Sequence, residues 1–131
     1  MLKLKRAYDA PARGDGWRVL VERLWPRGVR KEELAVGAWL KDLAPSTELR
    51  KWFGHDPERW SEFKQRYHRE LMQSPAHERL LELAHRAAKE TVTLIFSSHD
   101  TEHNNAVVLK AELDERVQRM AARAEHHPTG A

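Results

Sequence analysis

The alternation of hydrophobic and polar residues predicts three β-strands. Residues 2–8 alternate apolar and basic side chains, which is typical of a short strand, and a turn-forming segment follows at 10–16. A second strand over 17–24 contains a continuous apolar run, and residues 91–98 form the clearest strand pattern of the chain. Continuous apolar runs are typical of strands that are covered on both faces, so we expect 91–98 at the centre of the sheet.

Apolar residues at helical spacing predict helices between and after these strands. The pattern over 32–43 is weak because Gly37 interrupts it, whereas Ser46 and Gly54 supply a start and a stop for the next helix. Asp100 or Thr101 is expected to cap the last helix. The predicted helices cover residues 32–43, 47–53, 57–72, 75–88 and a segment after 101 that fades near residue 124.

Strands that alternate with helices predict an α/β fold, since a strand that returns parallel to its neighbour needs a crossover connection. We expect one small domain over residues 1–123. It has a mainly parallel sheet of three or more strands flanked by helices. The polar segment 124–131 is expected to be a disordered tail.

Composition adds further restrictions. The 131 residues fit one domain, and no apolar run approaches the roughly 20 residues of a membrane helix, so we expect a soluble protein without a membrane partner. The chain has no cysteine, which excludes disulfides, thiolate metal sites, iron–sulfur clusters and a cysteine nucleophile. The N-terminus also lacks the apolar segment of a signal peptide, and together these features lead us to expect a cytoplasmic protein.

The net charge of +3 is concentrated in one segment. Residues 17–30 contain four arginines and one acid, Glu22, which accounts for the whole excess. Arginine pairs with carboxylate or phosphate through two parallel hydrogen bonds, and Trp25 offers a flat surface for stacking. We therefore predict that Arg23, Trp25 and Arg27 bind an anionic ligand. The competing interpretation is that these arginines are solvated or structural and that Trp25 belongs to the core.

A second polar segment lies between the last predicted strand and the last helix. At the start of a helix, free backbone N–H groups can hold an anion, and the Asn104 and Asn105 amides add donors. His99 and His103 are candidate catalytic residues, because a histidine can act as general acid or base near neutral pH. Capping of the helix and a solvated surface position are the competing roles for these side chains.

The two polar segments are expected to meet. If the second and third strands are parallel, the loops that follow them leave the same edge of the sheet, where open α/β sheets bind ligands. We therefore predict one pocket between residues 22–30 and 97–105. His55 follows the aromatic pair at the end of the second predicted helix and is expected to bind the ligand from the wall of this pocket. Packing does not easily explain His55, Arg50 or Lys51, and a solvated surface position is the competing role for them.

Several long strings carry a family resemblance. VERLWPRG at 21–28, WLKDLAPS at 39–46, LRKWFGHDPERW at 49–60 and EHNNAVVL at 102–109 resemble the YeaO-like branch of the domain-of-unknown-function family 488. The resemblance implies a small α/β domain, and the family name itself records that no activity is established. The wider family is similar to thiol-bearing α/β domains with a cysteine near the end of the last strand. This chain has Ser97, Ser98 and His99 in that region, which excludes sulfur transfer through a persulfide.

Three functions remain open. The favoured hypothesis is binding of a small anionic molecule in the predicted pocket, with acid–base hydrolysis or transfer as an extension, so that enzymatic activity stays undecided. The first alternative is a nucleic-acid-binding or regulatory module, which the pI of 9.4 suggests but which the lack of a continuous basic stripe disfavours. The second alternative is a structural or protein-interaction domain that forms a homodimer through the apolar face of the last helix.

No cofactor is predicted. A metal ion is disfavoured, because His99 precedes the last helix and does not share a helix face with His103.

Overall fold

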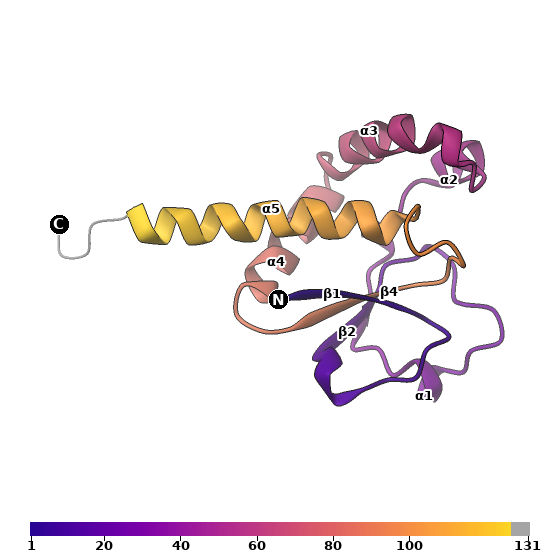
Figure 1. Cartoon of the computed structure of the whole chain (residues 1–131), viewed down its shortest axis with the longest axis horizontal. Coiled ribbons are helices and arrows are strands. Elements are labelled where there is room, and N and C mark those ends of the chain that lie inside the picture. Colours follow the sequence, from indigo (N-terminus) through magenta and orange to yellow (C-terminus); the bar gives the residue numbers. More distant parts are fainter. Residues whose placement is uncertain (127–131) are drawn as a thin grey trace.

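Four parallel strands form the sheet of the computed structural model, which describes residues 1–126 (Figure 1). The strands are β1 (Leu2–Arg6), β2 (Trp17–Leu20), β3 (Ala38–Trp39) and β4 (Val92–Phe96), in the order β1-β4-β2-β3. All five residues of β4 are buried between β1 and β2, which confirms the predicted central position. Because all pairs are parallel, the carboxyl ends of β1, β2 and β4 meet at one edge of the sheet.

The sheet has helices on both faces. The helices are α1 (Lys31–Leu34), α2 (Thr47–Phe53), α3 (Trp60–Leu71), α4 (Ala76–Ala87) and α5 (Asn105–His126). Helices α3, α4 and α5 lie on one side of the sheet and the short α1 on the other (Figure 1). This arrangement confirms the predicted α/β fold. None of the helices within residues 1–126 is long and apolar enough to cross a membrane.

Neighbouring residues of each central strand contribute to two separate apolar clusters. Val19 and Leu94 belong to the main core beneath α3, α4 and α5. Leu20 and Ile95 point to the opposite face, where they pack with Leu34 of α1. Since both faces of β2 and β4 are covered, the runs 19–21 and 94–96 are apolar without interruption, as the sequence pattern indicated.

The predicted helix over 32–43 is wrong. Helix α1 ends at Leu34, Ala35 adopts a left-handed φ of 50°, and the chain then turns at Gly37 into β3. A Cβ atom on Gly37 would collide with the indole of Trp17, so the turn requires glycine. The Gly37 N–H donates to the Arg18 carbonyl at 2.7 Å, and pairing with the free edge of β2 thus replaces a weakly helical pattern.

The other helix boundaries follow the sequence more closely. Helix α2 begins after Ser46, whose side chain accepts a hydrogen bond from Leu49 N–H at 3.1 Å, and ends at Gly54, which confirms both predicted signals. The predicted caps of the last helix are wrong: Asn104 caps α5 by accepting from Val107 N–H at 3.1 Å. Helix α5 continues to His126, beyond the start of the predicted tail, and 127–131 lie outside the described residues.

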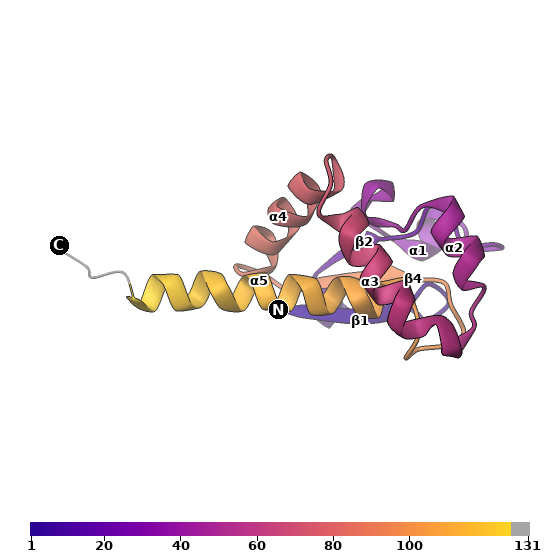
Figure 2. The same cartoon turned by 90° about the horizontal axis from the view of Figure 1, so that it is seen from above.

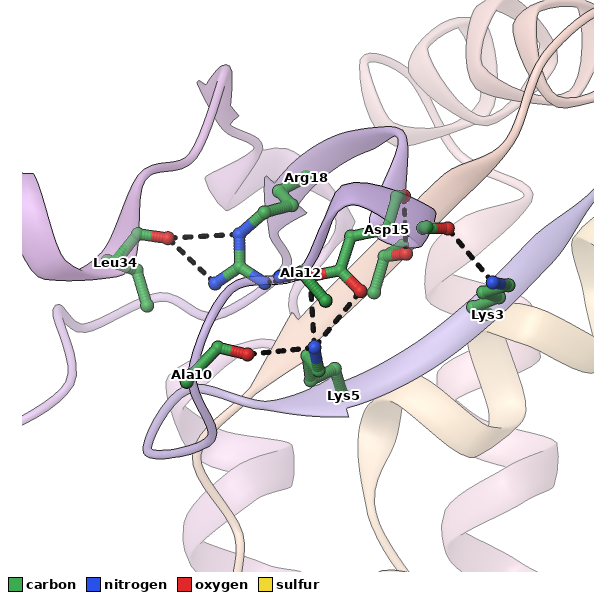
Figure 3. A network of polar contacts seen from close by, with 9 residues as sticks. Lys3, Lys5, Ala10, Ala12, Asp15, Arg18 and Leu34 are labelled. Atoms are coloured by element: carbon green, nitrogen blue, oxygen red, sulfur yellow. Dashed lines mark hydrogen bonds and ion pairs between the residues drawn. The ribbon is translucent and has the colours of Figure 1, made fainter.

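A buried ion cluster joins three segments of the N-terminal half (Figure 3). Asp15 accepts hydrogen bonds from Arg18 at 2.6 Å, from Lys5 at 3.0 Å and from the Ala12 N–H at 3.0 Å. The Arg18 guanidinium also donates twice to the Leu34 carbonyl at the end of α1. Arg18 is therefore structural, and it fixes the start of β2 against the loop before it and the helix after it.

Candidate functional site

A cavity of about 490 Å³ opens where β1, β2 and β4 end. This volume is within the range of small-molecule sites, roughly 300 to 1,000 Å³. The cavity is lined by the segments that follow these strands and by parts of α2, α3 and the start of α5. All eight residues predicted for the site line it: Arg23, Trp25, Arg27, His55, His99, His103, Asn104 and Asn105. The structure thus brings the predicted residues together, while their contact with a ligand stays a prediction.

Two of these residues stabilise the loops around the cavity. The Arg23 guanidinium donates to the Pro45 carbonyl at 3.2 Å and to the Ala44 carbonyl at 3.4 Å, which ties the loop after β2 to the start of α2. The Trp25 indole N–H donates to the Val29 carbonyl at 2.7 Å, and this hydrogen bond closes the turn over residues 25–29. Both side chains are half-buried, so each combines a structural contact with a position on the cavity wall.

Arg27 and Arg50 line the same cavity with exposed side chains. Within residues 1–126, no hydrogen bond or ion pair engages either guanidinium; Arg27 only accepts a hydrogen bond at its carbonyl, from the Tyr8 hydroxyl. Arg50 was not among the predicted site residues. Packing does not easily explain Arg50 from the sequence, but a solvated surface role is the favoured interpretation there.

Glu22 is an acid that links the end of β2 to the end of β4. Its Oε1 accepts a hydrogen bond from the Ser97 N–H after β4 at 3.0 Å, and its own carbonyl accepts from the Trp39 indole at 2.6 Å. Burial raises the pKa of Glu22, although the Ser97 N–H and the charge of Arg50 oppose the change. Sequence reasoning missed Glu22 as a site residue, since it counted this residue only as the one negative charge in a basic segment.

Tyr67, on α3, is close enough to Glu22 for the charge of this acid to affect it. The Tyr67 side chain is fully buried and donates its hydroxyl to the Leu43 carbonyl. Burial, together with the nearby Glu22 charge, raises the pKa of this phenol. Tyr67 is therefore a neutral hydrogen-bond donor that ties α3 to the segment before α2.

His103 is held in one orientation by Asp100. Its Nδ1 lies 3.0 Å from the Asp100 carboxylate, and its ring meets the indole of Trp60 edge-on with centroids 5.2 Å apart. The other Asp100 oxygen accepts the N–H groups of Glu102 and His103, each at 2.9 Å, and these hydrogen bonds lower the pKa of Asp100. Both Asp100 oxygens are therefore engaged, and Nε2 is the remaining free nitrogen of the His103 ring.

The other two histidines have fewer constraints. His99 Nδ1 lies 3.2 Å from Arg6 Nη2, and because arginine only donates, this nitrogen acts as the acceptor and the neutral ring carries its proton on Nε2. His55 is exposed, follows Gly54 with a left-handed φ of 59°, and lies 6.3 Å from the Phe53 ring. Both imidazoles line the cavity.

The side chains of Asn104 and Asn105 form hydrogen bonds at the start of α5. Besides its capping bond, Asn104 donates its amide to the Asp100 carbonyl at 2.8 Å. Asn105 donates to the Val21 carbonyl at 2.8 Å, which fixes α5 to the end of β2. Each amide group is thus already engaged in the protein, so the capping role considered from the sequence is present for Asn104.

Among the described residues, no group of three or more histidine or acidic side chains is placed to hold a metal ion.

Comparison with known proteins identifies relatives without an assigned activity. Residues 1–129 match the family described as the inactive DUF488-N3 subclade. The uncharacterised protein Rv3073c of Mycobacterium tuberculosis (strain ATCC 25618 / H37Rv) is 42% identical over 115 residues, which cover 88% of this chain and 95% of that protein. The uncharacterised protein YeaO of Escherichia coli (strain K12) is 42% identical over 108 residues, 82% of this chain and 92% of its own. No solved structure gives a significant match.

Proposed function

This chain belongs to the inactive DUF488-N3 subclade, and we propose that it binds a small anionic ligand in the cavity at the carboxyl ends of β2 and β4. The observation that carries the proposal is the pair Arg27 and Arg50. Both guanidinium groups line the cavity, and within residues 1–126 neither has an acceptor. An unengaged guanidinium is suited to a carboxylate or phosphate, to which it can donate two parallel hydrogen bonds.

The walls of the cavity indicate a ligand with an apolar part. Trp25, Phe53 and Phe63 line it together with two prolines, and Phe53 and Phe63 stack with ring centroids 4.4 Å apart. Aromatic walls combined with a few charged groups are typical of sites for small organic molecules. We therefore propose an organic carboxylate or phosphate in preference to a bare inorganic ion.

Binding without turnover is the form of this proposal that the family description supports. The Asp100–His103 pair is an arrangement that could orient a general base, which is the observation in favour of hydrolysis or transfer. The family, however, is described as inactive. We therefore assign His103 to ligand binding and not to catalysis.

The nucleic-acid alternative has less support. Several basic side chains of α3, α4 and α5 pair with an acid three or four residues away in the sequence: Arg66–Glu62, Arg79–Glu82, Arg86–Glu90, Lys110–Asp114 and Arg119–Glu115. These pairs offset part of the positive charge on the helices, whereas a nucleic acid requires an extended basic surface. The unpaired positive charge at the cavity fits a compact anion better than a polymer.

The test is a binding screen with matched variants. We expect phosphate, phenyl phosphate or benzoate to raise the melting temperature of the protein, and Arg27→Ala or Arg50→Ala to weaken the binding of these probes about tenfold, because each loses a charge-assisted hydrogen bond. Arg30→Ala is the control, since Arg30 pairs with Glu33 away from the cavity and should bind like the wild type. The proposal is wrong if no probe binds, or if all three variants bind equally well.

A further inference from the structure

The cavity contains a carboxylate as well as arginines, and this combination restricts the ligand further. We propose that the ligand carries an amino group in addition to its anionic group, and that Glu22 holds this amino group; the inference rests on the proposed function of the same cavity. The ligand class is then a small zwitterion, such as an amino carboxylate or an amino phosphate.

Glu22 is the acid in the cavity that has a free oxygen. Its Oε1 accepts the Ser97 N–H at 3.0 Å, and within residues 1–126 no donor engages its Oε2. Asp100 also lines the cavity, but both of its oxygens already accept hydrogen bonds from its own loop. An ammonium donor that enters the cavity therefore finds its acceptor at Glu22.

The carboxylate and the two arginines of the cavity differ in how far they are buried. Glu22 is half-buried and fixed to the ends of β2, β3 and β4, whereas Arg27 and Arg50 are exposed. A zwitterion would therefore place its amino group inward at Glu22 and its anionic group outward at the arginines. The aromatic side chains that share the lining suit an apolar connection between the two groups.

The electrostatics of the cavity favour such a ligand. A carboxylate that is removed from water without a full partner is destabilised, and burial accordingly raises the pKa of Glu22. Arg50 opposes this effect by its charge but makes no ion pair with Glu22. A ligand ammonium would supply the missing cation, so that binding favours the ionised form of Glu22.

The experiment uses probes that differ only in an amino group. The pairs are 4-aminobutanoate with butanoate, 6-aminohexanoate with hexanoate, and 4-(aminomethyl)benzoate with 4-methylbenzoate. Calorimetric titration at pH 7 compares the wild type with Glu22→Gln, which removes the charge but keeps an oxygen for the Ser97 N–H. The matched control is Glu102→Gln, because Glu102 is an exposed acid of the adjacent loop that does not line this cavity.

We expect at least one amino probe to bind the wild type about tenfold more tightly than its partner, as a charge-assisted hydrogen bond would produce. The preference should disappear in Glu22→Gln and persist in Glu102→Gln. The inference is wrong, although the anion site stands, if plain carboxylates bind in an Arg27-dependent manner and no amino probe gains affinity. It is equally wrong if the gain persists in Glu22→Gln. If none of the carboxylates binds, the inference is wrong, whereas the proposed function is wrong only if phosphate and phenyl phosphate also fail to bind.

A second measurement does not depend on the folding of Glu22→Gln. In wild-type protein labelled with ¹⁵N, the amino probe should shift the Ser97 amide resonance more than its partner does, because Ser97 N–H donates to the carboxylate that the ammonium contacts. Equal shifts from both probes would contradict a contact at Glu22.

Discussion

Asp15 shows how one buried acid can fix the local fold. Its side chain lies between Lys5 and Arg18, and its contacts join β1, the turn before β2 and, through Arg18, the end of α1 (Figure 3). Breaking a buried ion pair by removing one partner leaves the other charge without compensation. We expect Asp15→Asn to lower the free energy of unfolding by about 3 kcal/mol, measured by urea denaturation.

The control for Asp15 is another paired acid with more solvent contact. Asp114→Asn removes an ion pair with Lys110 on the surface of α5 and should cost less than about 1 kcal/mol. If the two variants lose similar stability, the buried cluster contributes no more than an ordinary surface pair.

The pKa of Asp15 predicts how the free energy of unfolding changes with pH. Burial acts to raise the pKa of Asp15, but the Ala12 N–H and the Lys5 and Arg18 cations outweigh it and lower the pKa from 3.8 to about 2. An acid with a lowered pKa stabilises the fold above its unfolded value, and the contribution is lost as the pH falls from about 4 to 2. The unfolding free energy of wild type should decline over this range, and that of Asp15→Asn should decline less. Parallel curves would contradict this assignment.

The arginines of residues 17–30 show what sequence alone cannot separate. All four have the same chemistry, yet Arg18 is buried with Asp15, Arg23 contacts backbone carbonyls, Arg30 pairs with Glu33, and Arg27 faces the cavity. The partners of Arg18 and Arg23 include carbonyl groups of other segments, and their identity does not appear in the sequence. The concentration of charge predicted the location of the cavity, but only the fold distinguishes the arginine that is free to bind.

At the scale of elements, the start of α5 connects helix stability to the cavity. Asn104 accepts from Val107 N–H in the first turn and lines the cavity with the same side chain. We expect Asn104→Ala to destabilise the protein by about 1 kcal/mol, whereas Asn104→Ser keeps a capping oxygen and restores most of the loss. Urea denaturation measures both, and equal losses in Ala and Ser variants would show that the cap is not the cause.

The element boundaries that sequence missed have a common physical reason. The segment 32–43 has a weak helical pattern, but Gly37 allows a turn and β2 offers a free edge, so a short strand forms there. Asp100 has good capping chemistry, yet it accepts the N–H groups of the turn before α5, and Asn104 caps the helix. In the first place pairing with β2 decides the structure, and in the second place a neighbouring side chain takes the capping position. At Ser46 and Gly54 no such contact competes with the local start and stop signals.

At the scale of the whole molecule, topology explains why the position of the cavity was predictable. Strands that alternate with helices run parallel, so the loops after β2 and β4 had to leave the same edge of the sheet. The contribution of α2 was less predictable, because Arg50 and Phe53 reach the cavity only through the packing of α2 on α3. The sequence therefore predicted the two loops of the cavity, while the third wall depends on tertiary contacts.

Helix α5 extends well beyond the sheet at its carboxyl end (Figures 1 and 2). Its first turns carry the fully buried Leu109 and Leu113, Val117 and Met120 are partly buried, and residues 121–124 are exposed. Backbone hydrogen bonds that lack buried apolar neighbours open without global unfolding. The helix should therefore differ in stability along its length.

We expect hydrogen exchange to resolve this difference. Amides of residues 109–113 should exchange as slowly as those of β4, which require global unfolding, whereas amides of 121–124 should exchange at least a hundredfold faster. Equal protection along α5 would mean that the projecting end is covered in solution. In that case protection should fall on dilution, which would support the homodimer that the apolar face of the last helix suggested, and protection independent of concentration would contradict that dimer.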